Sequence, residues 1–144
     1  MRTKTLTPLL VAATMTFVLA GAALALPHAT AKMTGAQEVP PVVTNATGTA
    51  AIRLNETRTA LTYDITVNGL SGPITLAHFH RGAVGVAGPV VKTITGSFSG
   101  STATGVWRDT DAEPLTPALV AEIMAGNIYV NVHTTLNGGG EIRG

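Results

Sequence analysis

The chain has 144 residues, nine of them basic and eight acidic, and it contains no cysteine. The lack of cysteine excludes disulfides, thiolate metal ligands, cysteine nucleophiles and a bacterial lipoprotein anchor. Any metal must therefore be held by imidazole nitrogen or by oxygen. A net charge close to zero gives no electrostatic basis for binding nucleic acid, and we predict no nucleic-acid partner.

The N-terminus has the features of a secretory signal peptide. Arg2 and Lys4 form a basic head, residues 9–26 are an almost continuous apolar run, and small residues form a cleavage site ending at Ala25. We predict cleavage after Ala25, with cleavage after Ala31 as the second choice. An uncleaved membrane anchor is the alternative, because the run is about as long as the shortest spanning helices.

The predicted organisation is a signal peptide over residues 1–25 and a single domain over residues 26–144. A chain of this length suits one compact domain. We expect the domain to be exported to the periplasm or the extracellular space, with no stable membrane insertion after cleavage. The sequence does not identify a protein partner.

The first half of this domain begins irregularly and then forms a predicted hairpin. Residues 31–47 contain glycine, asparagine and two adjacent prolines, which oppose regular structure. Residues 50–54 and 61–67 alternate apolar and polar side chains on either side of a turn-forming segment, residues 55–58. This alternation predicts two antiparallel strands with one buried face.

Two histidines occur in the next predicted strand, residues 74–80. His78 and His80 are two positions apart, so on a strand both imidazoles point to the same face. A glycine-rich loop follows, and then residues 90–94 form a short predicted strand. Residues 97–105 are small and polar, which indicates either a loop or a weak edge strand.

The second half contains one predicted helix, at about residues 116–125. Thr116 is a favourable N-cap, Pro117 suits the first helical position, and Gly126 suits the residue after the last turn. Residues 127–134 alternate as a strand, with Tyr129, Asn131 and His133 on one face, and residues 141–144 form a short final strand. Many short strands with one brief helix predict an all-β, antiparallel β-sandwich.

The main functional hypothesis is a metal site made of His78, His80 and His133. If the strand that carries His133 lies beside the other, three imidazoles can bind one copper ion or, alternatively, one zinc ion. The competing interpretation is that the three histidines are polar strand positions that hydrogen-bond the loops. We therefore predict copper or zinc as the cofactor, with no catalytic residue assigned.

Four further residues are candidates for supporting such a site. Glu141 is a candidate ligand or acceptor for an imidazole N–H, although a structural ion pair with Arg143 is the favoured interpretation. Arg81 could attract an anion to an open coordination position, or cap its strand in solvent. Tyr129 and Asn131 share a face with His133 and are candidates for the edge of the site, although tyrosine on such a strand often serves packing alone.

Three separated motifs span most of the domain. They are Gln37-Glu38-Val39-Pro40-Pro41-Val42, His78-Phe79-His80-Arg81-Gly82-Ala83 with Gly88-Pro89-Val90-Val91, and Tyr129-Val130-Asn131-Val132-His133-Thr134 with Gly140-Glu141-Ile142-Arg143-Gly144. Together they resemble the CHRD domain, the domain first noticed in chordin. The resemblance implies an all-β, immunoglobulin-like sandwich outside the cytoplasm, with no established enzyme activity, so we do not predict an enzyme. Eukaryotic members of the family also have cysteine-rich modules that bind growth factors. The sequence has no such module, so we do not predict growth-factor binding.

A second resemblance is local. The pattern of His78 and His80 before a glycine-rich loop is similar to the first copper-ligand strand of copper-zinc superoxide dismutases, which implies ligand roles for both and a superoxide-dismutase-like sandwich. Nothing matches the bridging histidine, zinc loop or disulfide of that family, so a superoxide-dismutase-type oxidoreductase is the least favoured function. The leading alternative to metal binding is an adhesion or matrix interaction module that uses exposed strand edges.

Overall fold

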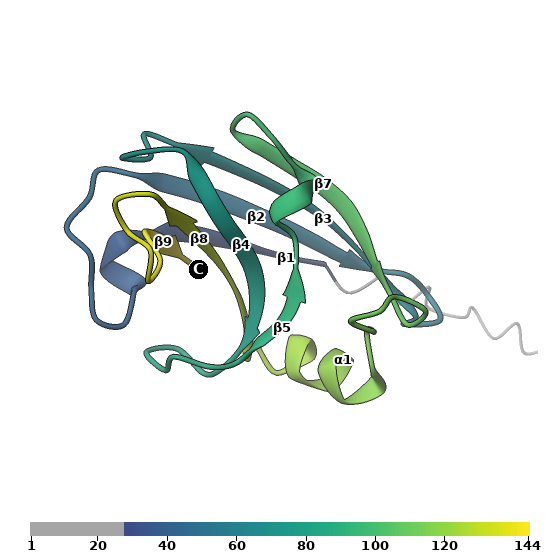
Figure 1. Cartoon of the computed structure of the whole chain (residues 1–144). Helices are drawn as coiled ribbons and strands as arrows, with labels where there is room; N and C mark the ends of the chain where they lie inside the picture. The colour runs from purple at the N-terminus through teal and green to yellow at the C-terminus, as the bar shows by residue number, and fades with distance from the viewer. Residues whose placement is uncertain (1–27) are drawn as a thin grey trace, which may run out of the picture.

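The protein is a curled antiparallel β-sheet with one short α-helix (Figure 1). The computed structural model describes residues 28–144. The expected signal peptide, residues 1–25, lies outside the described residues. The predicted all-β fold with a single short α-helix is confirmed for the part of the chain that the structure describes.

Nine strands form one continuous sheet, in the order β5-β4-β8-β9-β1-β2-β3-β7-β6, and every neighbouring pair is antiparallel. Two 3₁₀ turns, Gly35–Gln37 and Thr95–Ser97, and one α-helix, α1 (Pro117–Met124), complete the described chain. The strands are β1 (His28–Thr34), β2 (Thr47–Leu54), β3 (Ala60–Asn68), β4 (Ile74–Arg81), β5 (Val90–Thr93), β6 (Phe98–Ser99), β7 (Thr102–Arg108), β8 (Ile128–Thr134) and β9 (Ile142–Arg143).

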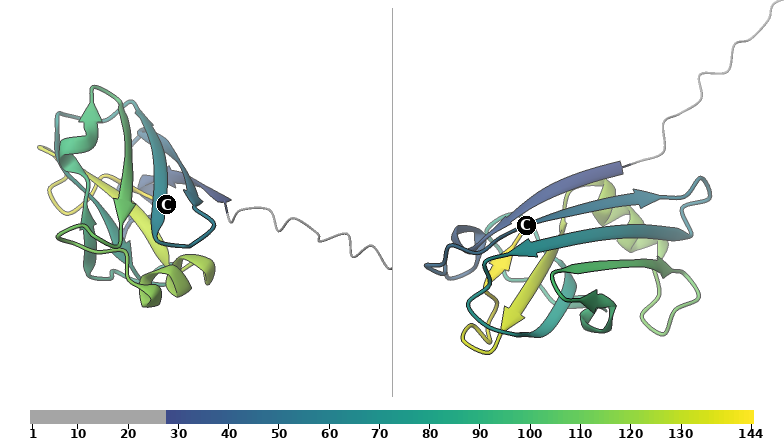
Figure 2. Two further views of the ribbon diagram at one scale, coloured as in Figure 1. Left: turned by 90° about the vertical axis from the view of Figure 1, so that its right-hand side faces the viewer. Right: turned by 90° about the horizontal axis from the view of Figure 1, so that it is seen from above.

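The sheet folds over into two layers, as expected for a sandwich, but the layers are joined along one edge. Strand β9, only two residues long, connects β8 in one layer to β1 in the other (Figure 2). Aromatic side chains from both layers meet in the core. The ring of Phe79 in β4 stacks on Trp107 in β7, with centroids 5.6 Å apart, and meets Tyr63 in β3 edge to face. Burying such large side chains supplies most of the free energy that holds the layers together.

The predicted hairpin is present as β2 and β3. Eight consecutive residue pairs join the two strands, from Thr47 opposite Asn68 to Leu54 opposite Leu61. The apolar residues of β3 alternate as expected, since Leu61, Tyr63, Ile65 and Val67 are all buried. This period of two is what places one face of the hairpin in the core.

Strand β1 contradicts the expectation of irregular structure from residue 31. It pairs with β2 along its whole length, from His28 opposite Arg53 to Thr34 opposite Thr47. Its residues are mostly small or polar, so the sequence pattern is weak, but pairing with β2 and burial of Met33 determine the conformation. For residues 97–105 the edge-strand alternative is confirmed, since β6 lies at the edge of the sheet, and β7 begins at Thr102 between β6 and β3.

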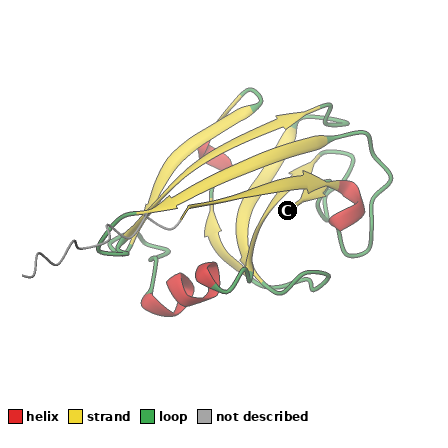
Figure 3. Cartoon of the chain, turned by 180° about the vertical axis from the view of Figure 1, so that it is seen from behind, coloured by secondary structure: helices red, strands yellow, loops and turns green. Residues whose placement is uncertain are grey.

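The predicted helix is confirmed as α1. The side chain of Thr116 accepts a hydrogen bond from the Leu119 amide at 3.2 Å, and Pro117 is the first helical residue. The side chain of Val120 is buried, and this attaches the helix to the core at one side of the molecule (Figure 3). Within residues 28–144, no helix has the length and hydrophobicity needed to cross a membrane.

Candidate metal centre

The two histidine-bearing strands lie side by side. Strands β4 and β8 are antiparallel neighbours in which Leu76 is opposite His133, His78 is opposite Asn131 and His80 is opposite Tyr129. Residues directly opposite each other in an antiparallel pair point to the same face of the sheet. All three histidines therefore project from one face, as the alternation in each strand predicts.

The three imidazoles are close enough to share one ion. The ring centroid of His78 lies 5.5 Å from that of His80 and 5.2 Å from that of His133. One nitrogen from each ring lies within 4.8 Å of those from the other two. Tetrahedral coordination with bonds of 2.0–2.1 Å places ligand nitrogens about 3.3 Å apart, so binding of one ion requires separations shorter than this 4.8 Å limit.

Backbone carbonyls orient two of the rings. The Nδ1 atoms of His80 and His133 lie 2.9 Å from the Gly88 oxygen and 3.0 Å from the Gly138 oxygen, respectively. A carbonyl oxygen can only accept, so each Nδ1 carries the proton and donates it. Each Nε2 is then left with a free lone pair, which is the arrangement that metal-binding histidines use.

The unpaired buried polar atoms of residues 28–144 all gather here. Buried side-chain nitrogen and oxygen atoms in folded proteins almost always have a partner, and the exceptions require an explanation such as a water or an ion. The five side-chain atoms that lack one within the described chain are Glu38 Oε1, His78 Nδ1, His80 Nε2, Asn131 Oδ1 and His133 Nε2.

The electrostatic environment favours neutral imidazoles. Burial lowers the pKa of His78, and the neighbouring His133 and His80 lower it further. Burial likewise lowers the pKa of His80, although the hydrogen bond to Gly88 acts in the opposite direction. A neutral ring is the form that can donate a lone pair to a metal, so less proton competition is expected here than at an exposed histidine.

Comparison with known proteins assigns the chain to a family. A model of the CHRD domain matches residues 29–144, which is nearly the whole described chain. The chain belongs to the CHRD domain family. The described chain is also similar to chordin from Xenopus laevis, with 36% identity over 112 residues, 73% of this chain and 11% of chordin. No solved structure matches the chain.

A buried ion pair of this CHRD domain, Glu38 with Arg143, borders the histidines and was not identified from the sequence. The Arg143 Nε lies 2.8 Å from the Glu38 carboxylate, and the two side chains are 7% and 2% exposed. Burial raises the pKa of Glu38, and the adjacent guanidinium opposes that shift. Glu38 belongs to the first CHRD motif, but a partner more than a hundred positions away leaves no local signal in the sequence.

Two of the four supporting candidates lie in the cluster. The ring of Tyr129 stacks on His80 with centroids 4.9 Å apart, and its hydroxyl accepts a hydrogen bond from the Gly88 amide at 3.0 Å. The Arg143 guanidinium lies over the Tyr129 ring, 4.7 Å from its centroid. Asn131 is buried and its amide points to Glu38 at 3.5 Å. Tyr129 therefore helps to hold His80 in position, whereas Asn131 contacts the ion pair beside the histidines.

The other two candidates lie elsewhere in the CHRD domain. Glu141 is fully buried and accepts hydrogen bonds from Thr44, Ser71 and Thr134. Its expected ion pair with Arg143 is wrong, because Arg143 pairs with a different carboxylate. Arg81 is exposed at the end of β4 and points away from the face that carries His80. Neither side chain reaches the histidines.

Proposed function

We propose that this CHRD-domain protein is exported and binds one copper ion, or alternatively one zinc ion, through His78, His80 and His133. The observation that carries the proposal is the convergence of three buried imidazoles, each with a nitrogen that has no partner in the described chain. A purely structural role would instead give these nitrogens hydrogen-bond partners, because an unpaired buried polar atom costs about 1–3 kcal/mol.

The donor set fits either ion. Three imidazoles with an open fourth position is an arrangement that zinc accepts, and copper(II) binds nitrogen ligands more tightly than zinc does. The carbonyls of Gly88 and Gly138 would keep the Nε2 atoms of His80 and His133 directed at the ion. Glu38 lies beside the site as a carboxylate that would offset part of the added positive charge.

The test is a metal titration of metal-free protein by isothermal calorimetry, once with copper(II) and once with zinc(II). We expect one ion per chain, and we expect His78→Ala or His133→Ala to weaken binding at least a hundredfold. His28→Ala is the matched control, because His28 is exposed on β1 and should leave the titration unchanged. Absence of binding to wild-type protein, or equal binding by His78→Ala, would reject the proposal.

Metal binding should also stabilise the fold. A ligand that binds only the folded state adds RT ln(1 + [L]/Kd), or about 2.7 kcal/mol at a free concentration of 100 Kd. Thermal unfolding with and without zinc measures this increase. His78→Ala should lose the increase while keeping an unfolding transition of its own.

Export is the second part of the proposal, and it rests on residues 1–25 together with the position of β1. Cleavage after Ala25 leaves β1 intact, since that strand begins at His28. Cleavage after Ala31 would remove more than half of β1 and its pairing with β2. Mass spectrometry of the protein recovered outside the cytoplasm should give an N-terminus at Leu26. A mature N-terminus at Lys32, or protein retained in the cytoplasm, would contradict this part.

A further inference from the structure

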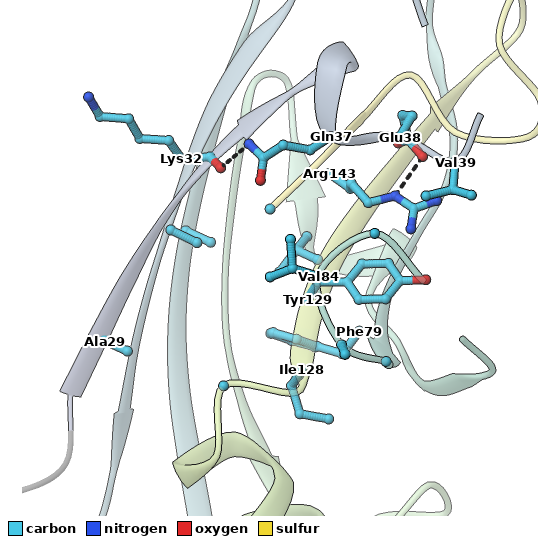
Figure 4. Close-up of a pocket in the computed structure, with 18 of the residues that line it drawn as sticks. Ala29, Lys32, Gln37, Glu38, Val39, Phe79, Val84, Ile128, Tyr129 and Arg143 are labelled. Atoms are coloured by element: carbon cyan, nitrogen blue, oxygen red, sulfur yellow. Dashed lines mark hydrogen bonds and ion pairs between the residues drawn. The ribbon is translucent and has the colours of Figure 1, made fainter. Parts of the chain in front are cut away.

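The sheet has a gap between the free edge of β1 and the first residues of β8, and we call this gap the lane. Strand β1 is paired with β2 along one edge, but on its other edge the ladder with β9 involves only Thr34, opposite Arg143. Strand β9 then ends after two residues. Beyond it, the edge of β1 and the first residues of β8 flank the lane (Figure 4), and no other strand of residues 28–144 pairs with either of them there.

Backbone groups on both sides of this lane point into it. The Lys32 carbonyl accepts a hydrogen bond from the Gln37 side chain at 2.9 Å, outside the β1-β2 ladder, so it faces the lane. By the two-residue period of a strand, Thr30 faces the lane as well. On the other side Val130 pairs with Gly144, and the same period directs the N–H and C=O of Ile128 into the lane.

An apolar cleft of about 840 Å³ lies under the lane (Figure 4). Small side chains of β1 and β2, including Ala31 and Ala50, line one wall, and Phe79 and Val130 line the other. Protein interiors are normally packed without such gaps. The space is therefore where the inward-pointing side chains of one more strand would lie, and its volume is in the range of binding sites.

We propose that this lane is a docking site for an extended segment of another protein, which adds to the sheet as a strand between β1 and β8. Its backbone pairs with Thr30 and Ile128, and its alternate apolar side chains fill the cleft, as in other cases of strand addition. A second copy of β1 is disfavoured as the occupant, because the charge of the exposed Lys32 on that edge opposes pairing between two copies of the strand. The proposal is independent of the metal site.

Exposed valines mark the entrance to the cleft. Val84 is 97% exposed and Val39 is 40% exposed, and both line the cleft. They come from two different loops, one after β4 and one after the turn that follows β1. Apolar side chains in such exposed positions gain free energy when a partner covers them, which supports a protein segment as the occupant.

The test uses a synthetic peptide of about seven residues that alternates valine or isoleucine with threonine. Amide hydrogen exchange by NMR is measured on the whole protein with and without the peptide. We expect new protection at the amides of Thr30 and Ile128, which face the lane. The same peptide methylated at the backbone nitrogens on its pairing edge should bind at least tenfold more weakly, because it cannot form the ladder.

Three variants complete the test. Ala31→Leu fills the cleft and Thr30→Pro removes an amide facing the lane, so each should weaken peptide binding at least tenfold. Ala51→Leu is the matched control, since Ala51 lies opposite Thr30 on the outer face and is exposed. No binding at millimolar peptide, or equal binding of the methylated peptide, would overturn the proposal. The second result would show that apolar side chains bind in the cleft without backbone pairing.

Discussion

The imidazoles of His78 and His133 meet edge to face, with ring centroids 5.2 Å apart. They come from β4 and β8, which are adjacent in the sheet although β5, β6, β7 and α1 separate them in the chain. The contact therefore exists only in the folded protein. It is the relationship that turns two separate sequence motifs into one candidate site.

Replacing Gly140 with alanine should destabilise the protein. Gly140 has a φ of +122°, and an added Cβ would lie 2.6 Å from the Asn131 Oδ1 and 2.8 Å from the Glu38 Oε1. Both the backbone strain and the close contacts oppose the substitution, so we expect a loss of about 1–3 kcal/mol in the free energy of unfolding. Urea denaturation measures this loss of unfolding free energy.

The neighbouring glycine supplies the control for that prediction. A Cβ added at Gly139 meets no atom within 4 Å. Gly139→Ala should therefore change stability by no more than about 0.5 kcal/mol. Equal losses for the two variants would show that Gly140 is not specially constrained.

Removing Glu38 should lower the free energy of unfolding more than removing the acidic residue of a less buried ion pair. Glu38→Ala leaves the buried Arg143 guanidinium without its partner, and we expect a loss of roughly 3–5 kcal/mol. The comparison is Asp111→Ala, which breaks the more exposed pair with Lys92 and should cost about 1 kcal/mol or less. Chemical denaturation of both variants measures the two losses of unfolding free energy. Similar losses would contradict a larger contribution from the more buried pair.

Stability should fall at acidic pH because of Glu141. Burial by itself raises the pKa of this carboxyl, but hydrogen bonds from Thr134, Ser71 and Thr44 outweigh burial and lower the pKa to about 2. A depressed carboxyl pKa stabilises the fold above the unfolded value of 4.5, and that contribution is lost as the pH falls from about 5 to 2. The lost contribution is about 3 kcal/mol.

The variant Glu141→Gln isolates the contribution of this carboxyl to the pH dependence of stability. It should be less stable than wild type at neutral pH, with a flatter dependence of unfolding free energy on pH between 5 and 2. Glu56→Gln, at an exposed turn, should retain the wild-type profile. A Glu141→Gln profile parallel to that of wild type would rule out the assigned role.

The Tyr129 hydroxyl should affect metal binding as well as stability. Tyr129→Phe leaves the Gly88 amide without its acceptor, and Gly88 in turn orients His80. We expect a loss of about 1–2 kcal/mol in stability and up to about tenfold weaker metal binding. Tyr63→Phe removes a hydroxyl that bonds Ser97 instead, so it should lower stability alone. Unchanged metal affinity in Tyr129→Phe would contradict the positioning role.

Local sequence patterns predicted the elements whose conformation depends on residues close together in the chain. The period of two placed His78 and His80 on one face, and the capping residues Thr116 and Pro117 located the helix within a residue at each end. Strand β1 was missed because its small and polar residues have little strand pattern of their own. Its conformation comes from pairing with β2, which is a long-range effect.

The remaining parts of the site depend on strand order. Nothing in the spacing of the motifs requires β8 to lie beside β4, or Arg143 to reach Glu38 across the sheet. The expected partner of Arg143 was the nearby Glu141, because proximity in sequence favoured it. In the fold the two side chains lie in different surroundings, and Glu141 bonds hydroxyl groups instead.

The most direct test of the metal proposal is long-range ¹H–¹⁵N NMR of the imidazole nitrogens during a zinc titration. One equivalent of zinc should shift the Nε2 resonances of His80 and His133 and one nitrogen of His78. The Nδ1–H groups of His80 and His133 should stay protonated, and His28 should not change. Unaltered resonances for the three histidines, or shifts shared equally by His28, would contradict a three-histidine metal site.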